Sequence, residues 1–225
     1  LVLLTDPALT AKIIKTANSP YFQTSVNEIE NVEQALFVLG REGLRNVVST
    51  TIMQPMLKGT DSKEAEFSHR VWQWALLAAS ASDMYRKKEE NDSTPLYLLS
   101  LLFALSYLSI FRFLLKCQKE YADLKTIEPS IVKSVIEDRC WSLCLGIVQK
   151  WSLPTACEKY LNVNEISDVK PEFSELKDGI VLAKFKVLQR FSDSPIDERK
   201  IHHLTSAPDA QDSVISRHLN SLELS

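Results

Sequence analysis

The sequence predicts an all-α protein, in which a multi-helix bundle surrounds one central apolar helix and a helical extension follows at the C-terminus. Three observations support this class. Apolar residues recur at three- and four-residue steps along most of the chain. Glycine is scarce, with 5 residues in 225, and alternating strand patterns are rare. Residues 96–115 are apolar on every side, as expected of a helix at the centre of a core.

The first expected helix starts at Asp6-Pro7, where the carboxylate can cap the backbone and proline suits the first turn. It should close at residues 18–20, because Pro20 disfavours helix continuation. Asn18 and Ser19 would form its C-terminal cap. Its apolar face consists of residues four apart, Leu9, Ile13 and Ala17.

Two further helices are expected on either side of Gly40. The first runs from Val32 to Leu39, with Asn31 as its cap and Gly40 as its stop. The second runs from about Glu42 to Met56, and Pro55 kinks or ends it. Its apolar side comprises Leu44, Val47, Val48 and Ile52.

Residues 63–90 predict one long helix beside the central one. Its charged end, residues 86–90, would be solvated. The inward face is formed by residues three or four apart: Phe67, Val71, Trp74, Leu77, Ala78 and Ala81.

The central stretch, residues 96–115, has two readings. Thr94 can cap it and Pro95 suits its first position. A membrane span needs roughly 20 apolar residues, whereas here Arg112 ends an uncharged run that begins at Leu96, and three serines dilute it. We therefore expect a buried core helix and no membrane span.

The remaining elements are shorter. Residues 121–123 predict a helical piece, residues 130–138 a helix after Pro129 with Ile131, Val135 and Ile136 apolar, and residues 140–151 its continuation. Residues 155–161 predict another helix, and residues 165–175 a polar connector. Residues 176–191 form a helix with Ile180, Ala183, Val187 and Leu188 inward, and Pro195 and Pro208 punctuate two more. We expect a main domain at residues 1–164 and an extension at 165–225 packed onto it.

The net charge and the positions of the cysteines limit the possible binding partners and the cellular compartment. The net charge is −3, so no basic field attracts nucleic acid. The four cysteines, Cys117, Cys140, Cys144 and Cys157, lie in apolar helical contexts and predict reduced core thiols of a cytosolic protein. Because Leu1 begins in mid-pattern, we expect the natural N-terminus to lie upstream.

Catalytic motifs are weak in this sequence. His202 and His203 are adjacent, so on a helix they point about 100° apart and do not chelate together. Cys140 and Cys144 could share a zinc ion, but no second pair is spaced to help. No Gly-x-Ser-x-Gly elbow occurs. The four tryptophans, Trp72, Trp74, Trp141 and Trp151, predict core positions, with Trp141 the most exposed.

A longer pattern resembles a known family. Residues 6–22, DPALTAKIIKTANSPYF, resemble the opening of the HDOD (HD-related output) domain, and the likeness continues to about residue 164. Its further anchors are Ile29, Ala35, Leu39-Gly40, Leu44, Val47-Val48, Trp72 and the stretch Trp151-Ser152-Leu153-Pro154, which is similar to the family's Trp-Gly-Leu-Pro. The resemblance implies an HD-like helical bundle from bacteria, related to metal-dependent phosphohydrolases.

Such phosphohydrolases hold one or two metal ions with histidine and aspartate side chains, which allows the metal to activate a water. The resemblance places those ligand positions on Trp74, Phe103, Ala104, Cys140, Val163 and Asn164. The His-Asp pair itself falls on Phe103-Ala104, inside the apolar helix. We therefore expect a degenerate site without metal or cofactor, in which Phe103 and Ala104 are buried near Trp74 and Cys140.

The expected function is a non-catalytic signal-transduction or scaffolding module that binds other signalling proteins in a bacterial cytoplasm. Two alternatives stay open. One is a metal-dependent HD-type phosphohydrolase acting on a nucleotide or cyclic dinucleotide. The other is a small-molecule sensor that uses the vestigial pocket. The sequence identifies no interface and no oligomeric state.

Overall fold

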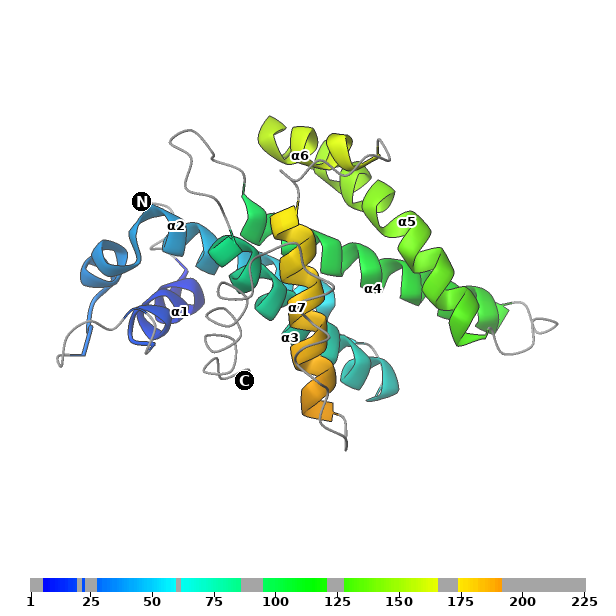
Figure 1. Cartoon of the computed structure of the whole chain (residues 1–225). Coiled ribbons are helices and arrows are strands. Elements are labelled where there is room, and N and C mark those ends of the chain that lie inside the picture. The colour runs from blue at the N-terminus through cyan, green and yellow to red at the C-terminus, as the bar shows by residue number, and fades with distance from the viewer. Residues whose placement is uncertain are drawn as a thin grey trace. The chain divides into compact units, whose positions relative to one another are not determined.

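The structure is a computed structural model that describes residues 6–19, 22, 28–59, 62–85, 95–120, 128–165 and 174–191, with backbone only at 62, 63, 163–165, 174, 190 and 191. These residues form seven α-helices and no strand, so the all-α class is confirmed. The helices are α1 (Pro7–Ala17), α2 (Val32–Met53), α3 (Ser62–Tyr85), α4 (Leu96–Glu120), α5 (Pro129–Lys150), α6 (Thr155–Glu165) and α7 (Ser174–Phe191) (Figure 1). A short 3₁₀ helix, Gln54–Leu57, follows α2.

The chain divides into two compact units, Leu1–Met56 and Leu57–Ser225. This division does not coincide with the expected boundary after Asn164. Helix α7, which belongs to the expected extension, packs along α3 and touches α4 within the second unit. Helix α7 is therefore packed against helices that precede it in the chain.

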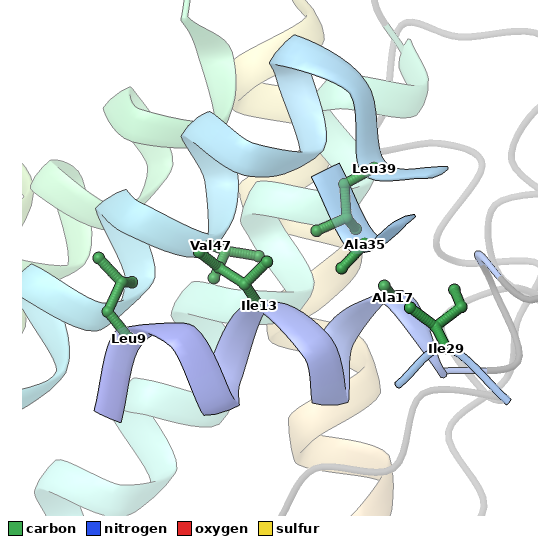
Figure 2. Close-up of a cluster of buried hydrophobic side chains, with 7 residues drawn as sticks. All are labelled: Leu9, Ile13, Ala17, Ile29, Ala35, Leu39 and Val47. Atoms are coloured by element: carbon green, nitrogen blue, oxygen red, sulfur yellow. The ribbon is translucent and has the colours of Figure 1, made fainter. Parts of the chain in front are cut away.

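The first unit is built on α1 and α2. Asp6 caps α1 by accepting hydrogen bonds from the backbone N–H groups of Ala8 (2.9 Å) and Leu9 (3.3 Å), and Pro7 occupies the first turn. Gly40 lies inside α2 with φ 62° and ψ −170°, a conformation that only glycine adopts readily. The two helices expected around Gly40 therefore meet there as one kinked element. The hydrophobic core of the first unit contains Leu9, Ile13, Ala17, Ile29, Ala35, Leu39 and Val47 (Figure 2).

Asn18 fastens the connection between α1 and α2. Its side-chain amide donates to the Ile29 carbonyl and its Oδ1 accepts from the Ile29 N–H, both at 2.8 Å. Asn18 is also the C-cap residue of α1, and Ser19 continues the turn through its N–H to Thr16. Because both polar groups of Ile29 are satisfied, its side chain can enter the core beside Ala17 (Figure 2).

The second unit is organised around α3 and α4. Helix α3 packs between α4 and α7, α4 packs on α5, and α5 packs on α6. Both central helices bury most of their middle turns, including Leu77, Ala78, Leu101 and Leu102. The expected central apolar helix is therefore α4, and α3 shares the centre with it.

Helix α4 also contacts α3 through a charged residue, Arg112. Arg112 Nε lies 2.5 Å from Glu64 Oε1, and its guanidinium also donates to the Lys58 carbonyl and to Ser68 Oγ (3.4 Å). Within the described residues, α4 is the one helix long and apolar enough to cross a membrane, and 44% of its most apolar window is buried in the protein. The ion pair with Glu64 shows that the guanidinium of Arg112 faces other parts of the protein.

Several boundary expectations need correction. Helix α4 starts at Leu96, so Pro95 precedes it and accepts from the Leu99 N–H. Helix α5 is continuous from Pro129 to Lys150, as expected, whereas α6 extends to Glu165, beyond the expected residue 161. Residues 86–94, 121–127 and 192–225, which include the charged run and the last expected helices, lie outside the described residues.

Two residues expected on the apolar or inward side of their helices are exposed instead, Ile52 (56%) and Leu188 (50%). Ile131, expected as an apolar residue of its helix, is also exposed (52%). Other residues of the same expected faces are buried: Val47, Ile136, Ile180 and Ala183. Thr50 and Met53 are buried in α2, Ile136 and Cys140 in α5, and Asp178 and Lys186 in α7. Helix α7 thus buries the expected Ile180 and Ala183, and its buried face also includes two charged residues that an apolar pattern does not predict.

Candidate functional site

Three of the residues expected at the family's ligand positions, Trp74, Phe103 and Cys140, lie together where α3, α4 and α5 meet. Trp74 on α3 lies edge-on to two rings of α4, with centroid distances of 6.1 Å to Phe103 and 5.2 Å to Tyr107. Such T-shaped contacts are favourable because the positive edge of one ring meets the negative face of the other. Trp74 is buried, and it keeps the α3 side of this region filled.

Helix α5 closes the region from the other side. The Trp141 ring lies 4.6 Å from that of Phe103, and Cys140 Sγ donates to the Phe103 carbonyl at 3.5 Å. Phe103 is half-buried and Ala104 is 1% exposed. The expectation that Phe103 is close to Trp74 and Cys140 is therefore confirmed, as is the burial of Ala104. The expected full burial of Phe103 is wrong, because its side chain is only half-buried.

More rings extend this region than the sequence analysis named. Phe67 on α3 lies 4.1 Å from Phe111 and 6.4 Å from Tyr107. We call the six rings of Phe67, Trp74, Phe103, Tyr107, Phe111 and Trp141 the aromatic cluster. The spacing of Phe103, Tyr107 and Phe111, four residues apart, could have indicated that α4 presents one aromatic face.

The titratable groups in this region stay neutral at ordinary pH. Burial, reinforced by the neighbouring Cys144, raises the pKa of the Cys140 thiol far above its usual value. Burial likewise raises the pKa of Cys144 to about 12. The pKa of Tyr107 is raised by burial and by the nearby Cys140 and Glu137. In the protein without a bound metal, both thiols therefore keep their protons at ordinary pH.

The residues present do not fit a metal ion of the kind that HD phosphohydrolases use. In the described part of the chain, no three side chains of His, Cys, Asp or Glu are grouped so that they could hold one. Trp74, Phe103 and Ala104 offer no metal-binding atom on their side chains. For Val163 and Asn164 only the helical backbone of α6 is described. His69 is exposed and contacts Gln73, and His202 and His203 lie outside the described residues.

The family-motif residues have structural positions. Leu39 and Trp72 are buried, while Trp151 is 42% exposed, which corrects its expected core position and makes it more exposed than Trp141. The Trp151–Pro154 stretch forms the turn between α5 and α6, held by the Leu153 N–H on the Val148 carbonyl at 3.0 Å. Ser152 adopts φ 51°, a left-handed conformation that favours glycine. This explains why glycine suits the same place in the family's Trp-Gly-Leu-Pro.

The expectation of buried core thiols holds for three of the four cysteines. All four are free thiols, of which Cys140, Cys144 and Cys157 are buried and Cys117 is partly exposed. Cys140 and Cys144 lie one turn apart on α5, and neither is part of a metal-binding group in the described residues.

Two solved structures show the fold to which this arrangement belongs. A protein from Shewanella amazonensis SB2B, provisionally described as a metal-dependent phosphohydrolase, is 17% identical with a TM-score of 0.64, and the match covers 97% of this chain and 81% of that one. An HDOD domain protein of unknown function from Geobacter sulfurreducens is 18% identical with a TM-score of 0.60, covering 98% and 80%. The molecule is thus a helical protein of HD-like fold.

The HDOD domain model matches residues 1–165 of the sequence. The chain belongs to the HDOD domain family, as the opening motif indicated. No protein with a curated description matches it. The two structural matches reach beyond residue 165, because a coverage of 97% leaves no room for the 18 residues of α7 to fall outside.

Proposed function

We propose that this protein is a non-catalytic signal-transduction or scaffolding module, which acts through protein–protein interaction in the cytoplasm of a bacterium. One observation carries the proposal: side chains of Trp74, Phe103 and Cys140 pack on one another where the resemblance places metal ligands. A hydrolytic water needs an ion held by several polar side chains and an open position beside it. Apolar side chains and protonated thiols supply neither the polar ligands nor the open position.

Membership of the HDOD family supports the same proposal, since that family is related to HD phosphohydrolases and is named for an output role. A domain without catalysis transmits a signal by presenting surfaces that partners recognise, and by shifting between packed arrangements of its helices. The other signalling proteins that it contacts would therefore determine its biological effect.

The main alternative is a metal-dependent phosphohydrolase acting on a nucleotide or a cyclic dinucleotide. The structural neighbour from Shewanella amazonensis, described as such an enzyme, favours it. This alternative requires ligands at other positions than those expected here. It predicts turnover that depends on Mn²⁺, Fe²⁺, Mg²⁺ or Zn²⁺.

The two functions separate in one experiment. The purified chain is incubated with each of these metals and a panel of nucleotides, cyclic dinucleotides and a generic phosphodiester, and product is measured by chromatography. We expect no turnover above that of heat-denatured protein. Turnover that follows the protein through two different purification columns and disappears with a chelator would overturn the proposal.

The interaction itself is tested in the bacterium that encodes the chain. The tagged protein is cross-linked in cells and recovered, and its partners are identified by mass spectrometry against an unrelated tagged helical protein. The proposal predicts at least one signalling protein recovered reproducibly with this chain alone. Repeated captures without such a partner would contradict it.

A further inference from the structure

We propose that Trp74 couples the aromatic cluster to helix α7, so that the cluster and α7 form one cooperative unit. Trp74 is the residue at which the two meet. On one side its ring packs against Phe103 and Tyr107 of α4. On the other its indole Nε1 donates to the main-chain carbonyl of Ile180 in α7 at 3.1 Å, in a buried environment. This inference does not depend on the proposed function.

The hydrogen bond makes the orientation of Trp74 depend on α7. A carbonyl inside a helix already accepts one backbone bond and has a second lone pair for the indole. If α7 moved away, the buried indole N–H would lose its partner, which costs more than a solvated bond gains. The ring would then have to turn toward another acceptor and leave its edge-on contacts.

A second contact fixes where α7 lies. Gly179, the residue before Ile180, approaches α3 so closely that a Cβ atom there would lie 2.7 Å from the Ser82 backbone nitrogen. Ser82 in turn receives a hydrogen bond from Ser100 of α4 at 3.1 Å. Helix α7 is thus held against α3 at Trp74 and at Ser82, and both points connect onward to α4.

The aromatic cluster extends this connection to α5. Trp141 contacts Phe103, Phe103 contacts Trp74, and Trp74 holds Ile180. Trp141 is half-buried, so one end of the series reaches the surface. Packed rings have discrete arrangements and do not deform continuously. A change in the packing of Trp141 on α5 is therefore transmitted to the contact between α3 and α7.

Hydrogen exchange of backbone amides tests the coupling in the full chain. Trp74→Phe keeps a ring against Phe103 and Tyr107 but removes the donor to Ile180. We expect exchange in α7 to rise about two- to tenfold, the range that follows from losing one hydrogen bond. Exchange in α6, which packs on α5, should change less and serves as the internal reference.

Two substitutions on α4 test the transmission. Phe103→Leu disturbs the aromatic cluster, whereas Phe113→Leu changes an exposed ring ten residues further along the same helix. We expect only Phe103→Leu to raise exchange in α7 relative to α6. In the double variant with Trp74→Phe, the two fold-changes should not multiply, because both remove the same connection.

Three results would each overturn the proposal. The first is equal exchange changes in α6 and α7 after Trp74→Phe. The second is the same α7 response to Phe103→Leu and Phe113→Leu. The third is a double variant in which the two fold-changes multiply, which would show that the sites act independently.

Discussion

At the scale of single residues, Asn18 has the sharpest role in the first unit. Its amide both donates to and accepts from the backbone of Ile29. Asn18→Asp keeps the acceptor, loses the donor and sets a carboxylate against the Ile29 carbonyl. We expect the free energy of unfolding to fall by about 1–3 kcal/mol, measured by urea denaturation.

Asn31→Asp is the matched control for this change. Asn31 caps α2 only by accepting a hydrogen bond from the Gln34 N–H at 2.9 Å, which aspartate can accept as well. We expect its stability to stay within about 0.5 kcal/mol of the wild type. Equal losses of unfolding free energy from the two variants would show that the paired hydrogen bonds of Asn18 to Ile29 contribute no more than the single capping bond of Asn31.

The buried thiols predict how stability depends on pH. Burial raises the pKa of Cys144 from 9.0 to about 12 in the folded chain. Above pH 9 the unfolded thiol loses its proton and the folded one keeps it, so stability is full below pH 9 and falls as pH rises toward 12. Urea denaturation at pH 8 and pH 10 should show a steeper loss for the wild type than for Cys144→Ala. Equal slopes would contradict the role of this thiol.

Single residues also mark the limits of reading this sequence. The Phe103–Trp74–Cys140 association followed from the family resemblance, because three separate anchors placed those positions together. The exposure of Ile131 and Leu188 could not be foreseen, since short apolar patterns fit several helix faces equally well. The bond from Trp74 to Ile180 joins residues 106 positions apart, which no local pattern encodes.

At the scale of elements, caps and breakers predicted helix starts well. Asp6, Asn31 and Pro129 each stand at or beside the start of a helix, as their chemistry requires. Helix ends were less certain because α4 and α6 continue through polar residues that carry no stop signal. The close packing of α7 on α3 could not be predicted from the sequence, because no local pattern indicates that Gly179 lies against Ser82.

Helix α7 offers a direct test of that seat. Gly179→Ala places a methyl group against the Ser82 backbone, so α7 must shift from α3. Despite the better helix propensity of alanine, we expect the free energy of unfolding to fall by about 1–3 kcal/mol, as for an overpacked core. Thermal and urea denaturation measure the change.

Gly146→Ala is the corresponding control on α5. A Cβ atom at Gly146 meets no atom within 4 Å, so helix propensity alone should act and raise stability by about 0.5–1 kcal/mol. Opposite signs for the two glycines are the expected result. A stabilised Gly179→Ala variant would show that α7 is not tightly seated.

At the scale of the whole molecule, the fold and the filled site have one common cause. A helix apolar on every side, α4, occupies the place where the resemblance puts the His-Asp pair of HD enzymes. Its rings meet those of α3 and α5, so aromatic packing joins the three helices at this place. The resemblance predicted that Phe103 lies close to Trp74 and Cys140, whereas the identity of the six packed rings required the structure.

The metal content of the purified protein tests this account most directly. The chain is produced in medium supplemented with Mn, Fe and Zn, desalted without chelator, and analysed by inductively coupled plasma mass spectrometry. Because the grouped side chains around Phe103 offer no ligand set, we expect every metal at far below one equivalent, and no change in melting temperature on adding a chelator. One or two equivalents of metal whose removal lowers the melting temperature would contradict it.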